Sequence, residues 1–226
     1  GVYHADDQLI ERFDEPDAAR VERNIAAVGR LAAAVDVPVS LALVPTAACI
    51  QSDRLPQGAP SADQDALLRQ IAAGVSVPMP DLRDALAAHR DEYIFYRTDH
   101  HWTTRGAYYG AAVLRETLGL APLPALDDLT PERVTDAFNG TLYSSSGYRD
   151  VTPDTIDLYI PAGAAQVTTW KNGKAEAGAL YDRSYLAQKD KYSLFLGGNT
   201  PRAVIQTGNA GGRLLLVRDS YADSLA

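Results

Sequence analysis

Cysteine is almost absent from this sequence: Cys49 is the one cysteine among 226 residues. A single cysteine excludes an internal disulfide and any zinc site built from cysteines. The sequence also lacks an apolar run of 18 or more residues and a signal-peptide pattern, so no segment predicts a transmembrane helix. Runs of five or more basic residues are missing, and the net charge is −8. These features argue against a nucleic-acid binder and favour neutral substrates over polyanions.

What is present is an ordinary globular composition, with 46% apolar and 22% charged residues. This length predicts a single domain over residues 1–226. The chain starts abruptly at Gly1 and stops at Ala226, just past a strand-to-turn pattern. We therefore expect truncation at both ends, with a signal or anchor and a C-terminal element removed.

The first half of the chain alternates helix and strand patterns. Apolar residues three and four positions apart predict a helix over 17–35, capped by Asp17. Further helices are expected over 61–74 with a serine cap, over 81–89, and over 103–118 with Thr103 or Thr104 as the cap. Buried or aromatic strands are expected over 39–44 and 93–96.

The second half is richer in loops and β patterns. Residues 121–155 predict a long loop with one short helix at 131–138. Strands are then expected over 155–160, 166–170, 193–197, 204–207 and 213–217, with a turn at 172–173. Together the patterns predict a three-layer α/β domain with a mostly parallel sheet. We place a loop-rich and β-rich insertion at residues 121–192.

Asp99, His100 and His101 stand in a row between an expected strand and a capped helix. Ligand sites in open α/β sheets lie at such strand ends. A carboxylate two residues before a histidine can hold the Nδ1 side of the imidazole and leave Nε2 free as a base. The alternative is that Asp99 caps the turn while the histidines pack in the interior.

Ser220 follows the apolar run 214–217 and precedes a helix-compatible stretch. A hydroxyl at such a strand end lies near helix N–H groups, which stabilise a developing oxyanion. Because a serine hydroxyl is nearly inert without a base, we expect the His101 region to supply one. Alternatively, Asp219 or Ser220 only caps the helix.

A third strand end carries Gly197-Gly198-Asn199, whose amide would donate to the same oxyanion. The alternative here is an ordinary Gly-Asn turn ahead of Pro201. Asp99, His101, Ser220 and Asn199 all fall at strand ends of one expected sheet, and their meeting in one site is a hypothesis from this placement.

The run Asp99-His100-His101-Trp102-Thr103 resembles the signature of the bacterial DHHW proteins. That family is similar to the alginate O-acetylation proteins of the SGNH-hydrolase-like group. The resemblance extends to residues 1–13, 43–46 and 53–56 and to the closing Arg218-Asp219-Ser220-Tyr221, so it spans nearly the whole chain. It implies a flavodoxin-like α/β/α sheet and a Ser-His-Asp triad in permuted order, with Asp and His before Ser.

Carried over residue by residue, the resemblance makes Asp99 the orienting acid, His101 the base and Ser220 the nucleophile. Asn199 is a weaker match to the oxyanion asparagine of SGNH enzymes. The alginate relatives carry a different residue at the position of His100, which leaves two candidates for the base; we prefer His101. Triads are defined by geometry and not by chain order, so the permutation is no objection.

The resemblance implies a carbohydrate O-acetyltransferase or acetylesterase that acts through an acyl-serine and needs no cofactor or metal. Its expected partners are a cell-envelope or exported polysaccharide and a membrane protein that donates the acyl group. With such a substrate, the loop over 139–150, with Tyr143, Tyr148 and Arg149, is a candidate sugar-contacting surface or else a packed loop. The expected location is extracytoplasmic. Two alternatives are a non-catalytic polysaccharide-binding scaffold and a metal-dependent phosphoesterase, for which only His4 and His89 remain as further histidine ligands. Cys49 is expected to be a packing residue and not a nucleophile.

Overall fold

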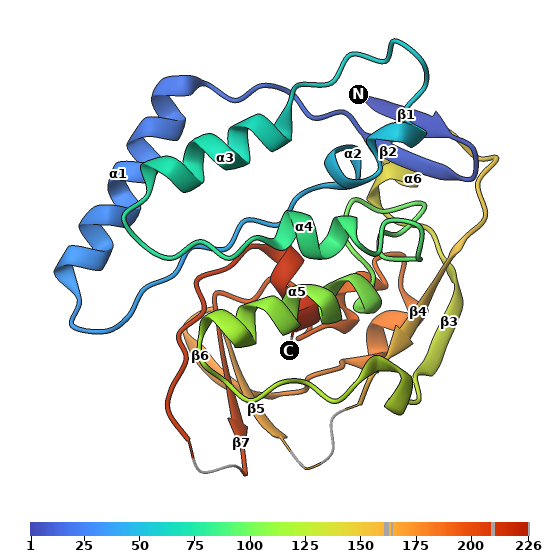
Figure 1. The fold of residues 1–226 in the computed structure, drawn as a ribbon. Helices are drawn as coiled ribbons and strands as arrows, with labels where there is room; N and C mark the ends of the chain where they lie inside the picture. Colours follow the sequence, from blue (N-terminus) through green and yellow to red (C-terminus); the bar gives the residue numbers. More distant parts are fainter. Residues whose placement is uncertain (161–162, 164, 209–210, 226) are drawn as a thin grey trace.

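The computed structural model describes residues 1–160, 163, 165–208 and 211–225 (Figure 1). The helices are α1 (Ala18–Ala34), α2 (Ala47–Ile50), α3 (Gln64–Gly74), α4 (Leu82–Ala87), α5 (Thr104–Thr117) and α6 (Thr141–Ser146). The strands are β1 (Val2–Ala5), β2 (Gln8–Glu11), β3 (Glu132–Phe138), β4 (Asp154–Leu158), β5 (Ala165–Lys171), β6 (Lys174–Gly178) and β7 (Arg202–Thr207). Short 3₁₀ helices are η1 (Ser52–Arg54), η2 (Leu126–Asp128), η3 (Arg183–Ala187), η4 (Tyr192–Leu194) and η5 (Ser220–Leu225).

The predicted helices form where their capping residues allow. The Asp17 carboxylate accepts a hydrogen bond from Arg20 N–H and begins α1, as expected. Helix α3 begins later than expected, because Asp63 and not Ser61 supplies the cap, by accepting from Ala66 N–H. Thr103 caps α5 through Gly106 N–H, which confirms that prediction.

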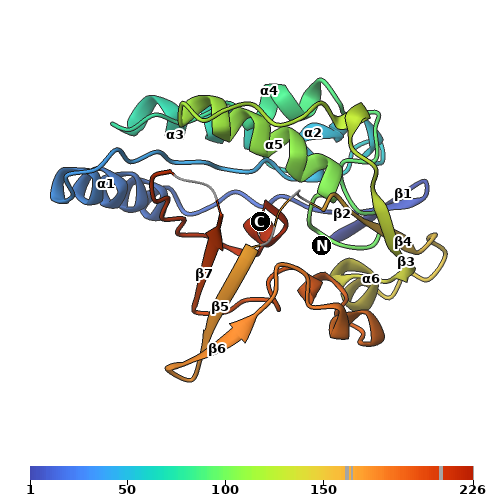
Figure 2. The ribbon, with the colours of Figure 1, turned by 90° about the horizontal axis from the view of Figure 1, so that it is seen from below.

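The strands pair in three small sheets, which are β1–β2, β3–β4 and the three-stranded β6-β5-β7. Every one of these pairings is antiparallel, so the mostly parallel sheet is not formed by the described residues. The turn at Asn172-Gly173 is confirmed: both residues have positive φ, 50° and 77°, as a tight hairpin turn requires. Helices α3, α4 and α5 lie together on one side of the molecule, and β5–β7 project from the other (Figure 2).

Two predicted central strands are wrong. Residues 39–44 are extended between Pro38 and Pro45, and Leu41 N–H donates to Pro78 O, but no ladder forms. Residues 213–217 are also without a strand partner, and Leu215 is 86% exposed. An apolar run indicates a strand only if another strand accepts its backbone hydrogen bonds, and none of the described strands does so here.

Three shorter predictions also fail for identifiable reasons. The helix expected over 131–138 is replaced by β3 (Glu132–Phe138), because pairing with β4 outweighs the local pattern. Residues 193–197 do not form a strand, because η4 is followed by Leu196 and Gly197, both with positive φ. The aromatic segment 93–96 makes a single bridge, from Phe95 to Trp102, instead of a strand.

Two buried clusters flank the segment that carries the histidines. One gathers Tyr96, Phe138, Ile156, Leu158, Tyr192, Leu194 and Phe195. The other gathers Ile50, Leu86, Ile94, Phe95, Trp102 and Ala107. Helix α5 packs closely on the Trp102 indole, since a Cβ on Gly110 would lie 2.7 Å from Trp102 Cζ3. The segment between Tyr96 and Trp102 is therefore fixed at both ends, because each of these rings is fully buried. None of the helices among the described residues has the length and apolar character needed to cross a membrane.

Candidate active site

A buried carboxylate on β4 shapes the loop that carries the histidines. Asp154 is fully buried and accepts hydrogen bonds from Arg97 N–H at 2.6 Å and Thr98 N–H at 2.8 Å. The Thr98 and Tyr93 hydroxyls donate to the same carboxylate. Burial raises the pKa of Asp154, while these four donors oppose that shift. The backbone just before Asp99 is thus held in one conformation from a neighbouring strand.

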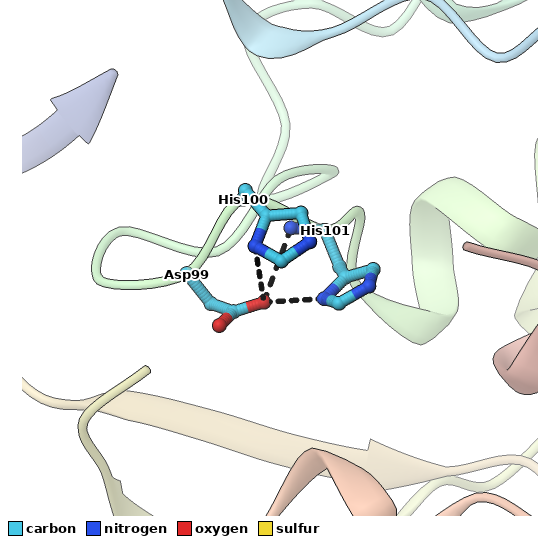
Figure 3. A group of neighbouring side chains, drawn as sticks. All are labelled: Asp99, His100 and His101. Carbon is cyan, nitrogen blue, oxygen red and sulfur yellow. Dashed lines mark hydrogen bonds and ion pairs between the residues drawn. The ribbon is translucent and has the colours of Figure 1, made fainter. Parts of the chain in front are cut away.

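The Asp99 carboxylate is held on both oxygens. Its Oδ1 accepts from His101 N–H at 3.1 Å and lies 2.5 Å from His101 Nδ1 (Figure 3). Its Oδ2 accepts from Thr141 N–H at 2.8 Å and from the Thr141 hydroxyl at 2.9 Å. Burial alone would raise the pKa of Asp99, but the hydrogen bond and positive charge of His101 outweigh it and lower the pKa to about 2.

The other nitrogen of His101 meets a residue 119 positions later. His101 Nε2 lies 2.8 Å from Ser220 Oγ, at the start of η5. Since Asp99 occupies Nδ1, Nε2 is the nitrogen available to take the serine proton. The structure therefore brings together Asp99, His101 and Ser220, the three residues predicted as a triad.

Aromatic residues of the two motifs fasten these segments to each other. The Trp102 indole N–H donates to Tyr221 O and Ser224 Oγ, both at 2.9 Å. In the opposite direction, the Tyr221 hydroxyl donates to His100 O. The buried Asp223 pairs with Arg218 and closes the turn around Ser220. The meeting of His101 with Ser220 thus rests on contacts from their immediate neighbours.

Tyr192 contributes to the site and was missed by sequence reasoning. Its ring stacks on the His101 imidazole, with centroids 3.9 Å apart and an angle of 7° between the planes. Its hydroxyl donates to Ser220 O at 3.0 Å. Tyr192 is buried, and burial raises the pKa of its phenol, which stays protonated at neutral pH. The available signal was the aromatic residue that opens the apolar run 192–196.

Gly140 and Thr141 are two further residues of the site that sequence reasoning missed. A Cβ on Gly140 would lie 2.7 Å from the Asp99 carboxyl carbon and nearer still to its Oδ2. Only glycine lets this backbone approach the carboxylate, and the next residue then donates to it twice. An Asn-Gly-Thr sequence before a short helix was the signal in the sequence.

Asn199, the predicted oxyanion donor, is exposed and makes no hydrogen bond to Ser220 among the described contacts. Its role stays a prediction. In the sugar-contacting loop, the Arg149 guanidinium lies 4.5 Å from the centre of the Tyr143 ring and donates to Tyr143 O and Tyr148 O. A hollow of about 310 Å³ beside this loop also includes Lys189 and Lys191 in its lining. That surface role likewise stays a prediction.

The remaining reactive residues lie apart from the triad. His89 Nδ1 lies 2.7 Å from Glu92, and His4 Nε2 lies 2.9 Å from Asp150 O. Within the described residues, Asp99, His100 and His101 form the one group with metal-ligand spacing, and two of them, Asp99 and His101, hydrogen-bond to each other in the predicted triad. Burial, aided by the Asp65 carboxylate, raises the pKa of Cys49 to about 11, so its thiol is a poor nucleophile at neutral pH.

Comparison with known proteins gives the family. The family model described as the SGNH hydrolase-like domain of the acetyltransferase AlgX matches residues 2–189. The chain belongs to this family. The match includes Asp99 and His101 and ends before Ser220, so the residue predicted as the nucleophile lies outside the matched range. Among curated proteins, none matches the chain.

Three solved structures are similar in fold to this chain. A DHHW family protein from Eubacterium siraeum is 28% identical, with a TM-score of 0.80, over 99% of this chain and 76% of that one. Bacillus cereus PatB1 with a sulfonyl adduct is 19% identical, with a TM-score of 0.79, over 99% and 80%. The O-acetyltransferase domain of Pseudomonas putida AlgJ is 24% identical, with a TM-score of 0.54, over 70% and 63%. The predicted fold family and the resemblance to DHHW proteins are thereby confirmed.

Proposed function

We propose that this chain is a serine-dependent carbohydrate O-acetyltransferase or acetylesterase that acts on a cell-envelope or exported polysaccharide. The observation that carries the proposal is the His101 imidazole, with Nδ1 2.5 Å from Asp99 and Nε2 2.8 Å from Ser220 Oγ. Membership of the family that includes the acetyltransferase AlgX supports an acetyl ester as the substrate.

In the first half-reaction, His101 Nε2 takes the Ser220 proton while Oγ forms a bond to the acetyl carbonyl carbon. The ionised Asp99 stabilises the imidazolium that results. The tetrahedral oxyanion accepts hydrogen bonds from Ser220 N–H, which donates to no other described residue, and, as predicted, from Asn199. Collapse breaks the ester C–O bond, and His101 returns its proton to the leaving oxygen.

In the second half-reaction, an acceptor hydroxyl loses its proton to His101 and attacks the acetyl-serine. The acceptor is a sugar hydroxyl in a transferase and water in an esterase. Bond formation to the new oxygen and release of Ser220 Oγ, which takes back the proton, regenerate the site. We infer an extracytoplasmic location, a polysaccharide substrate and a membrane acyl-donor protein from the family, in which the relative AlgJ has an O-acetyltransferase domain.

Hydrolysis of p-nitrophenyl acetate tests the triad. Ser220→Ala, His101→Ala and Asp99→Ala are each expected to lower kcat by orders of magnitude, and combining them should cost little more, because the three act as one unit. Ser76→Ala and His89→Ala, at sites away from the triad, serve as controls. A mild His101→Ala together with a damaging His100→Ala would show that the base is misassigned.

Covalent labelling separates an enzyme from a non-catalytic scaffold. PatB1 carries a sulfonyl adduct in its solved structure, so a sulfonyl fluoride is the probe chosen. We expect one sulfonyl group per chain, on Ser220, as the Oγ–S bond forms, fluoride leaves and His101 takes the proton. Peptide mass spectrometry that finds no adduct on Ser220 in folded protein would reject the proposed nucleophile.

A further inference from the structure

A cavity of about 250 Å³ lies beside the triad. Leu9, Phe13 and Leu142 contribute apolar walls, and Asp99, His100 and Tyr221 are also among the lining residues. One water occupies about 30 Å³ in the liquid, so the cavity is large enough for a sugar ring rather than one or two waters. His100 lines this cavity and has no role in the proposed triad, which uses only His101.

The hydrogen bonds of His100 fix where its proton lies. His100 Nδ1 is 2.7 Å from Thr141 Oγ1, and that hydroxyl donates to Asp99 Oδ2 at 2.9 Å. Because the ionised carboxylate can only accept, the hydroxyl gives its single proton to Asp99 and must accept from His100. Asp99 Oδ1, 4.0 Å from His100 Nδ1, favours a proton on the same nitrogen.

The remaining nitrogen, His100 Nε2, then carries a lone pair. No described residue donates a hydrogen bond to it. Burial, followed by the positive charge of His101, lowers the pKa of His100 and keeps its ring neutral at neutral pH. A neutral imidazole protonated on Nδ1 accepts at Nε2 and cannot donate there. Its complement in a ligand is a hydroxyl or an N–H group.

The ring of His100 lies against the base of the triad. The centroids of the His100 and His101 rings are 3.9 Å apart, and the His100 side chain is 32% exposed (Figure 3). A ligand bound to the His100 ring therefore lies close to the imidazole of His101, the proposed base.

Charge in the cavity selects against anionic ligands. Three carboxylates, those of Glu11, Asp14 and Asp99, line it together with one guanidinium, that of Arg12. Arg12 Nη2 already pairs with Asp14 at 2.7 Å. A sugar carboxylate would meet net negative charge there, whereas an uncharged sugar meets no such repulsion. Arg12 Nε is buried and has no hydrogen-bond partner among the described residues.

We propose that this cavity is the acceptor subsite for an uncharged sugar, one hydroxyl of which donates to His100 Nε2. The inference rests on the proposed function and names the class of acceptor. Glu11, Asp14 and Asp99 set the preference for neutral sugars, and His100 aligns the acceptor beside His101. His100 is a binding residue in this scheme and takes no part in proton transfer.

Acceptor competition tests the subsite. With p-nitrophenyl acetate as donor, pentasaccharides of N-acetylglucosamine and of mannuronate are compared as neutral and anionic acceptors. Total turnover is read as p-nitrophenol and transfer as acetylated pentasaccharide by mass spectrometry. We expect transfer to the neutral pentasaccharide to exceed transfer to mannuronate at least tenfold, and Glu11→Gln to narrow that difference.

Substitution of His100 separates its two nitrogens. His100→Asn keeps an N–H toward Thr141 and removes the acceptor at Nε2, so the ratio of transfer to hydrolysis should fall about tenfold through the acceptor KM. His100→Gln restores an acceptor oxygen at longer reach and should recover about threefold of that loss. His89→Asn, the same substitution in a histidine outside the cavity, should keep the wild-type ratio.

An equal ratio in His100→Asn and wild type, or a preference for mannuronate, overturns the subsite. Failure of the proposed function gives a different result: wild type would release p-nitrophenol no faster than Ser220→Ala, which would contradict both proposals. Nitrogen NMR of Ser220→Ala keeps the test independent of His100 substitutions. We expect His100 with Nδ1 protonated and Nε2 unprotonated, and an Nε2 shift that moves on addition of the neutral pentasaccharide. A protonated Nε2 contradicts the assignment.

Discussion

Gly140→Ala is a small change that tests the Asp99 half of the site. Gly140 has φ of −82° and ψ of −160°, a conformation that alanine adopts without strain. The cost therefore comes from the new Cβ, 2.7 Å from the Asp99 carboxyl carbon. Asp99 has nowhere easy to move, because four donors from His101 and Thr141 hold its two oxygens.

The magnitude follows from two opposing effects. Overpacking a methyl group costs about 1–3 kcal/mol, and replacing glycine stabilises by about 0.4–1 kcal/mol through the unfolded chain. We expect a net loss of about 1–2 kcal/mol in the free energy of unfolding. Displacing the Asp99 carboxylate by about 1 Å should lower kcat about 100-fold, since catalytic groups tolerate little misplacement.

Urea unfolding and p-nitrophenyl acetate kinetics measure the two effects on Gly140→Ala. The matched control is Gly29→Ala in α1, where the added Cβ meets only Ser76 Oγ at an ordinary 3.5 Å. That change should stabilise by about 0.5–1 kcal/mol, as for glycine in a helix interior, with wild-type kcat. A folded Gly140→Ala protein with wild-type kcat would refute the claim that this backbone approach positions Asp99.

Three further outcomes are expected. The folded-state pKa of Asp99, about 2, is below its ordinary 3.8, so ionised Asp99 contributes about 2 kcal/mol to the free energy of unfolding above pH 4 and loses this contribution as the pH falls toward 2. Acid unfolding of wild type and of Asp99→Asn measures this contribution, and an identical pH dependence of unfolding in the two proteins would contradict it. Tyr192→Phe keeps the ring on His101 but loses the bond to Ser220 O, so kcat should fall about fivefold, and Tyr192→Leu should lose at least fivefold more with the stacking; equal kcat in both variants excludes a positioning role. Asp154→Asn presents an amide N–H to backbone donors and should cost about 2–4 kcal/mol in urea unfolding; a loss below 1 kcal/mol would show that the loop holds its own shape.

The sequence predicted which residues meet at the candidate site better than it predicted the sheet. The meeting of Asp99, His101 and Ser220 could be predicted because a carboxylate, an imidazole and a hydroxyl form a recognisable set, and because the motifs resemble a known family. The local helices were also predictable, since caps such as Asp17 and Thr103 act within three residues. Both successes depend on signals that are contained in a few neighbouring residues.

The failures come from partners distant in the chain. Residues 39–44 and 213–217 have strand composition, but strand formation depends on a neighbour that no local pattern specifies. Residues 131–138 become β3 because β4 lies beside them. For the same reason Tyr192 and Thr141, which lie 91 and 40 residues after His101, could not be assigned to the site from their local signals alone.

The contacts of Trp102 and Tyr221 with the opposite motif bear on how relatives should be judged. A homologue that retains the acid, the imidazole and the hydroxyl but replaces the indole would still possess every reacting group and have lost the means of assembling them. Judging such a homologue only by its acid, histidine and serine would then overestimate its activity. The two short motifs are better treated as a single inherited unit, to be transplanted or exchanged together.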